Sequence, residues 1–221
     1  MRLFPLTRPA LILMGLCILI ELGLQLGDLG LFDIPRFRAQ VYEYAGFWPG
    51  LLVNWRPNYP FQTSLMFLTY GFLHAGLWHL TLNMITLWSL SGAVSARVGS
   101  VKFLTIYALS ILGGGAGYAI FADTFRPMVG ASGALFGLAG AILAWEYVDR
   151  FLLRKGLWPV ARAALLLAGL NVALYYAMGG VLAWEAHLGG FVAGWVAALL
   201  VDPRARPDPR GQTDDGSQED G

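Results

Sequence analysis

The sequence has little charge and only one cysteine. Of its 221 residues, 13% are charged and 57% are hydrophobic, a balance too apolar for an ordinary soluble domain of this length. The formal net charge is +1 and Lys and Arg form no cluster, which argues against a nucleic-acid partner. Cys17 alone cannot form an intrachain disulfide, and its apolar surroundings predict a buried structural thiol. The composition predicts an integral membrane protein embedded in a lipid bilayer.

Six apolar segments are candidates for membrane-spanning helices. A spanning helix needs about 20 apolar residues, because its backbone polar groups must be satisfied within the segment. The fourth and sixth segments are short, which indicates helices that begin below the membrane surface beside a sunken cavity. The sequence therefore predicts an all-α membrane protein with a single six-helix domain over residues 1–201. The segments are 9–26, 73–93, 101–122, 129–145, 163–182 and 186–201.

The segments outside these helices differ in character. The first connection, about 27–72, is long and rich in aromatic rings, which favour the headgroup level, so we expect an interfacial loop. The tail, 202–221, is polar and rich in Pro, Asp and Glu, which predicts a disordered end. The rings of the first connection are Phe47, Trp48, Trp55, Tyr59 and Phe61.

The distribution of positive charge predicts the orientation in the membrane. Most of the 15 Lys and Arg residues lie at the amino end, in the second and fourth connections and in the tail. Cytoplasmic segments carry such an excess, so both termini should face the cytoplasm, as in a multi-pass protein of a bacterial inner membrane. Arg2 and Arg8 before an apolar run also permit a cleaved signal peptide, although no small-x-small site closes that run before Gln25.

Several polar side chains interrupt the apolar segments, all toward the outer side. Such residues are costly in a membrane and mark cavities or functional sites. His79 and Asn83 are four residues apart, so they share one face of the second span. Ser132 opens the fourth span and His187 opens the sixth, while His74 precedes His79 in the second. We expect one site formed by three helices.

Small residues accompany both Ser132 and His187. Gly133 and Gly137 follow the serine, and Gly190 and Gly194 follow the histidine. Small residues four apart let helix backbones approach closely. Close packing of the fourth and sixth spans would bring the Ser132 hydroxyl within hydrogen-bond reach of the His187 imidazole.

A serine beside an imidazole is suited to nucleophilic catalysis, because the imidazole can accept the hydroxyl proton near neutral pH. We therefore predict Ser132 as nucleophile and His187 as general base. Glu185 should point to another face, so a dyad is expected rather than a triad, and Phe136 could stack on the imidazole. Candidate donors for an oxyanion are the Ser132 backbone N–H, His79 and Asn83.

These residues resemble the rhomboid family of intramembrane serine proteases. The likeness covers roughly 72–201 and rests on three ordered motifs. It implies a rhomboid-like bundle and a serine endopeptidase, without metal or cofactor, that cleaves in or beside transmembrane segments of membrane proteins. It implies the same roles for Ser132, His187, His79 and Asn83, with His74 and Gly130 lining the site. The motifs are His74-Ala-Gly-Leu-Trp-His79-Leu-Thr-Leu-Asn83, Gly130-Ala131-Ser132-Gly133 and Ala186-His187-Leu-Gly-Gly190.

Two positions depart from the family pattern. Leu65-Met66 stand where many members carry a Trp-Arg pair, and Ser95 stands where relatives often have glutamate. Both departures concern how the first loop is anchored. A further hypothesis is that the fifth helix, with its end from Tyr175 to the glycine pair at Gly180, and the fifth connection together move as a gate, because paired glycines loosen a helix terminus.

Two other functions remain open from the residues. One is a non-catalytic rhomboid-like protein that binds membrane helices. The other is a membrane protein in which His74, His79 and His187 ligate a metal or carry protons. The substrate, the cleavage-site preference, the oligomeric state and the role of the tail do not follow from the sequence.

Overall fold

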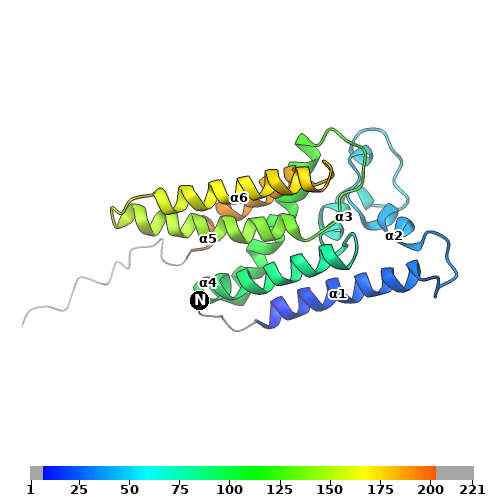
Figure 1. Cartoon of the computed structure of the whole chain (residues 1–221), viewed down its shortest axis with the longest axis horizontal. Helices are drawn as coiled ribbons and strands as arrows, with labels where there is room; N and C mark the ends of the chain where they lie inside the picture. Colours follow the sequence, from blue (N-terminus) through cyan, green and yellow to red (C-terminus); the bar gives the residue numbers. More distant parts are fainter. Residues whose placement is uncertain (1–6, 203–221) are drawn as a thin grey trace, which may run out of the picture.

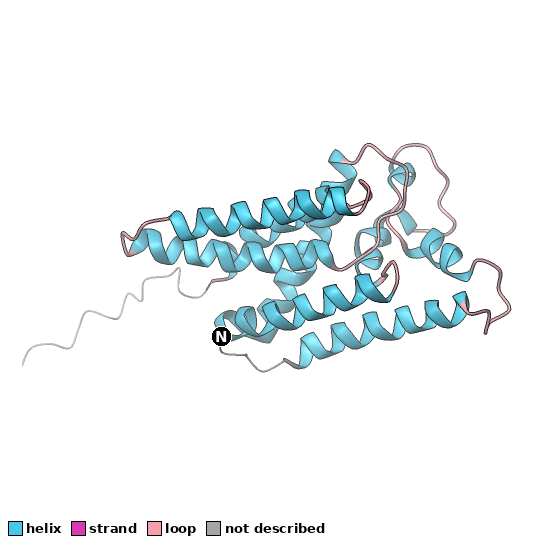
Figure 2. Cartoon of the chain, viewed as in Figure 1, coloured by secondary structure: helices cyan, strands magenta, loops and turns pink. Residues whose placement is uncertain are grey.

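The computed structural model describes residues 7–202 as an all-helical bundle, with no strand among them (Figures 1 and 2). This confirms the predicted fold class. Length and hydropathy qualify α1, α4, α6 and α7 as membrane spans. The predicted tail lies outside the described residues except for Asp202, and the division into 1–201 and 202–221 stays a prediction. The long helices are α1 (Arg8–Asp28), α4 (Leu77–Phe121), α5 (Ser132–Leu152), α6 (Trp158–Ala177) and α7 (Trp184–Val201).

Helix α4 contains two membrane crossings. A straight helix of 45 residues would be about 67 Å long, more than twice the apolar thickness of a bilayer. Gly99 interrupts the helix with a φ of 82° and a ψ of 170°. His79 and Phe121, near its two ends, line the same cavity. The chain therefore doubles back at Gly99, and the two arms, 77–98 and 100–121, supply the second and third of the six predicted crossings.

The helix ends correct several predicted boundaries. The second crossing begins at Leu77, so His74 lies in the turn before it and not within the span. Residues 94–98, expected in a connection, are helical, and the break is confined to Gly99. Helix α5 has 21 residues and was wrongly expected to be short, because the polar residues of its last turns ended the apolar run early. Helix α6 ends at Ala177, and Gly179 and Gly180 follow it with positive φ angles of 64° and 79°.

The first connection is folded rather than extended. It contains α2 (Phe37–Ala45), the 3₁₀ turn η1 (Pro49–Leu52), α3 (Gln62–Thr69) and the 3₁₀ turn η2 (Tyr70–Phe72). Phe47 was expected at the membrane interface, but it is fully buried and meets Phe67, Tyr70 and Tyr118 edge to face. Its backbone also exchanges two hydrogen bonds with Met128, at 2.9 and 3.0 Å. This bridge joins the first connection to the loop before α5.

Glycines allow α7 to sit against both α5 and α4. A Cβ added to Gly190 would overlap the carbonyl group of Gly133, and one added to Gly194 would overlap that of Gly137. The backbones of α5 and α7 are therefore in direct contact, as the small-residue spacing predicts. An adjoining face of α7 meets the second arm of α4 in the same way, through Gly113, Gly117 and Gly189.

The end of the bundle remote from Ser132 is held by an ion-pair cluster. Arg97 donates two hydrogen bonds to Asp149, at 2.7 and 3.1 Å, and one to Asp202 at 2.7 Å. Its guanidinium also lies 5.0 Å from the ring centre of Trp145. The cluster joins the turn of α4 to the ends of α5 and α7. It therefore fixes how far the three helices are shifted along one another.

The glycine contacts predict a matched pair of stability effects. We expect Gly194→Ala to lower the free energy of unfolding by about 1–3 kcal/mol, because the methyl group must push α5 and α7 apart. Gly169→Ala on α6 is the control, because a Cβ there meets nothing within 4 Å and alanine favours a helix. Thermal unfolding in detergent measures both. An equal midpoint for the two variants would contradict close contact at Gly194.

Candidate active site

Ser132 and His187 meet at the start of two neighbouring helices. Ser132 is the first residue of α5, and His187 lies in the first turns of α7. The Ser132 Oγ and the His187 Nε2 are 2.8 Å apart, a hydrogen-bond distance. Both side chains reach this position because Gly133 and Gly190 allow the two backbones to touch just beyond them. The proximity expected from the sequence is present.

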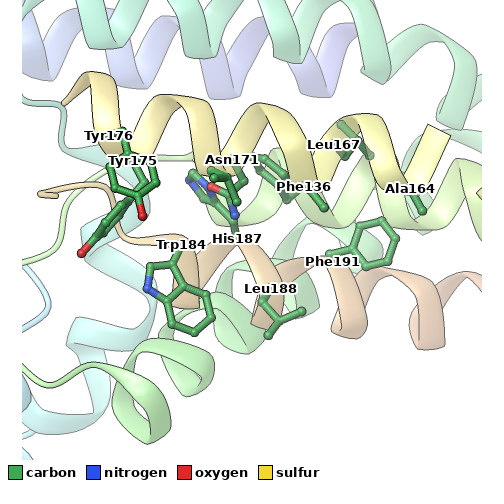
Figure 3. A pocket seen from close by; sticks show the side chains of 12 residues that line it. Phe136, Ala164, Leu167, Asn171, Tyr175, Tyr176, Trp184, His187, Leu188 and Phe191 are labelled. Carbon is green, nitrogen blue, oxygen red and sulfur yellow. The ribbon is translucent and has the colours of Figure 1, made fainter. Parts of the chain in front are cut away.

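The imidazole of His187 is held on three sides. Phe136 stacks on it with a centroid distance of 4.2 Å and an interplanar angle of 9°, so the expected stacking is present. The Nδ1 atom lies 2.9 Å from the Oδ1 of Asn171 on α6. Figure 3 shows these two side chains facing each other across the space between α6 and α7. Neither ring nitrogen is bound to a carboxylate, which agrees with the expected absence of a Ser-His-acid triad.

Sequence reasoning missed Asn171. The sequence did contain an indication of its role. Asn171 is the one asparagine in an otherwise apolar part of α6, and polar residues within apolar helices usually face a partner. It was overlooked because no periodic or motif relation links it to His187, which is 16 residues further along the chain. Only the packing of α6 beside α7 brings them together.

Two adjoining cavities meet at His187. The first has a volume of about 840 Å³ and is bounded by both ends of α4, the loop before α5 and the segment between α6 and α7. Ser132, His79 and Gly130 line it together with His187. The second, of about 500 Å³, lies among α5, α6 and α7, and Figure 3 shows its apolar lining. His187 therefore stands between a polar hollow and an apolar recess.

His79 and Gly130 lie against each other at the wall of the first cavity. The Nδ1 of His79 accepts a hydrogen bond of 3.2 Å from the Ala75 N–H, so in the neutral ring Nε2 carries the proton. Gly130 has a φ of +133°, and a Cβ there would lie 2.7 Å from the imidazole of His79. A glycine is thus required both by the backbone conformation and by the space.

Asn83 lies one turn deeper than His79. It is 4% exposed, and its Nδ2 donates a 2.8 Å hydrogen bond to the His79 carbonyl. It therefore shares the face of His79, as the spacing of four predicts. Its side chain does not itself line the cavity.

His74 occupies a different position from the other two histidines. It is fully buried in the turn before α4, and its ring meets that of His79 edge to face at 5.2 Å. Burial, with the neighbouring His79 as a smaller cause, lowers the pKa of His74 to about 3, so the ring is neutral near pH 7. It packs behind His79 and does not line the cavity. Among residues 7–202, no three His, Cys, Asp or Glu side chains are grouped so that they could hold a metal ion.

The first connection is anchored through Arg38. Its guanidinium binds both carboxylate oxygens of Glu21, at 2.9 and 3.0 Å, and Glu21 is fully buried on α1. Arg38 and the Tyr42 hydroxyl both donate to the His74 carbonyl, at 3.0 and 2.6 Å. Helix α1, the first connection and the turn before His79 are thereby tied together.

Comparison with known proteins agrees with the motifs. A family model described as the Rhomboid domain matches residues 62–204. The chain is 33% identical over 129 residues to the Rhomboid protease GluP of Bacillus subtilis, covering 58% of this chain and 24% of that protein. It is 27% identical over 195 residues to the mitochondrial Rhomboid protein 1 of Saccharomyces cerevisiae (82% and 53%). For the Rhomboid protease GlpG of Yersinia enterocolitica the identity is 26% over 154 residues (68% and 54%).

The chain thus spans about half the length of these relatives or less. The matched domain includes all of the cavity-lining histidines and Ser132, but it leaves out α1 and Arg38. The anchor between Glu21 and Arg38 therefore lies outside the matched domain.

The anchor predicts an asymmetric response to mutation. We expect Arg38→Ala to lower the free energy of unfolding by about 3–5 kcal/mol, because it leaves the Glu21 carboxylate buried without its cation. Adding Glu21→Gln to that variant should restore part of the loss by removing the charge. Thermal unfolding in detergent is the measurement.

Asp28→Ala is the control for the anchor. Asp28 also pairs with Arg38, but its side chain is 41% exposed, so its loss should change stability by about 1 kcal/mol or less. If Arg38→Ala were no less stable than Asp28→Ala, the buried pair would not hold the first connection.

Proposed function

Because the chain belongs to the rhomboid family, we propose that it is an intramembrane serine endopeptidase that hydrolyses peptide bonds in or beside transmembrane segments of membrane proteins. The observation that carries this proposal is the 2.8 Å hydrogen bond between Ser132 and His187 at the wall of a hollow in a membrane bundle. The named proteases among its relatives support the reaction class.

The proposed reaction begins with the Ser132 hydroxyl, which donates its hydrogen bond to the Nε2 of His187. As Oγ attacks the scissile carbonyl carbon, His187 takes the hydroxyl proton, and a tetrahedral intermediate forms. His187 then gives that proton to the leaving amine, which departs as the acyl-enzyme forms. A water molecule, deprotonated by the same imidazole, hydrolyses the ester and regenerates the serine. The stacked Phe136 keeps the ring plane fixed during these transfers.

The proposed oxyanion site has three kinds of donor. The Ser132 N–H, at the first position of α5, has no acceptor within the helix. The Nε2–H of His79 is available because its Nδ1 accepts from Ala75. Asn83 uses one amide hydrogen on the His79 carbonyl and keeps a second, which it can donate to an oxyanion only after its side chain turns toward the cavity.

Access to the site follows from its two cavities. Asp123, Thr124 and Arg126 line the larger cavity and are polar, which suits the entry of water. The apolar recess beside Phe136 and Phe191 suits an apolar side chain of the substrate. A helical substrate hides its carbonyl groups in its own hydrogen bonds, so it must unwind locally before cleavage. In the orientation proposed from the Lys and Arg distribution, the cavity opens on the outer side. The gate at the end of α6 stays a prediction.

Active-site labelling tests the proposed function. A fluorophosphonate should label the protein in detergent, and Ser132→Ala and His187→Ala should abolish labelling, because one removes the nucleophile and the other its base. The exposed Ser64 on α3 provides the matched control, and Ser64→Ala should label like the wild type. Equal labelling of the wild type and Ser132→Ala would overturn the proposal and would favour a non-catalytic member of the family.

The oxyanion site makes a separate prediction. His79→Ala and Asn83→Ala should each lower the second-order rate constant of labelling by roughly 100-fold or more, the usual effect of losing one oxyanion donor. Thr81→Ala, on the same turn of α4 but bonded to its own helix backbone, should change the rate little. A variant that labels at the wild-type rate removes that residue from the oxyanion site.

A further inference from the structure

The hydrogen bond between Asn171 and His187 fixes the protonation pattern of the imidazole. An amide oxygen can only accept, so the Nδ1 facing the Oδ1 of Asn171 carries the ring proton. The neutral ring then has its lone pair on Nε2, the atom that faces the Ser132 hydroxyl. The opposite tautomer would put a proton on Nε2 and leave it unable to accept from the serine.

Asn171 belongs to the least buried of the long helices. Val160 is the only buried residue of α6, and most of the helix presents its side chains to the surroundings. Within residues 7–202, only one hydrogen bond joins an α6 side chain to another helix, and it is the one between Asn171 and His187. The orientation of the candidate base therefore depends on a helix that has few other ties.

We propose that Asn171 is a positioning residue for the Ser132–His187 dyad: from α6 it accepts the Nδ1–H of His187 and so holds the imidazole in the tautomer that can take the serine proton. The inference rests on the proposed function and adds a regulatory consequence to it. If α6 moved away from α7, the imidazole would lose this partner, so the base is oriented only while α6 lies against α7.

The test compares three substitutions by their rates of fluorophosphonate labelling in detergent. Asn171→Leu keeps the approximate size but removes the acceptor, and it should lower the rate by about 10- to 100-fold, the range that is typical when a metal-bound histidine loses its hydrogen-bond partner. Asn171→Asp keeps an acceptor and should label faster than Asn171→Leu. Leu170→Ala, at a neighbouring position that is 52% exposed, is the control and should label like the wild type.

The pH dependence separates positioning from a merely structural role. A carboxylate at position 171 stabilises the imidazolium, so the acid limb of the rate profile should move to higher pH in Asn171→Asp. The other titratable groups that line the larger cavity with His187 are the same in every variant: Tyr42, Tyr70, His79, Tyr118, Asp123, Arg126, Tyr175 and Glu185. A shift of the acid limb of the rate profile therefore reports on position 171, even if Asn171→Leu does not fold.

The outcomes distinguish this inference from the proposed function. If Asn171→Leu folds and labels within twofold of the wild type, or if the acid limb of Asn171→Asp does not move, the positioning role is overturned while the dyad stands. If Ser132→Ala labels like the wild type, the dyad itself fails. A slow Asn171→Leu together with a faster Asn171→Asp whose acid limb is displaced supports the inference.

Discussion

The contact between the backbones of α5 and α7 is the constraint on which the rest of the structure depends. Gly190 and Gly194 lie directly on the carbonyl groups of Gly133 and Gly137, and no larger residue fits at these positions. In a bilayer, where lipid is as apolar as leucine, such close packing is a main source of attraction between helices. The same contact sets the distance between the Ser132 hydroxyl and the His187 imidazole at the ends of the two helices, so stability and proposed chemistry share one interface.

Polar side chains attach the more loosely packed parts of the chain to this rigid centre. Arg38 joins the first connection to the buried Glu21 of α1 and to the turn that carries His74. Asn171 joins α6 to His187. Away from water an unpaired polar group is costly, so each bond selects one arrangement of its helices. The bonds of Arg38 support the wall of the cavity, and the bond of Asn171 reaches the candidate base, His187.

The motifs and the spacing of small residues were sufficient to predict the helical class, the six crossings and the meeting of Ser132 with His187. Helix boundaries were predicted less well. His74 was placed within a span because its neighbours are apolar, and α5 was cut short because Glu146 and Asp149 end its apolar run. Phe47 was placed at the interface because aromatic rings favour it, but the ring fills the core between three other rings.

The sequence by itself determined which residues can do chemistry, because histidine, serine and asparagine in apolar spans are rare and expensive, and glycines four apart mark the faces that touch. Beyond the Ser132–His187 pair, only the tertiary structure decided which polar side chains meet. Arg38 finds Glu21, and Asn171 finds His187, through the packing of helices that no periodic pattern relates. Local spacing shows which face of a helix a residue occupies. Which other helix lies against that face depends on how all the helices of the bundle pack together.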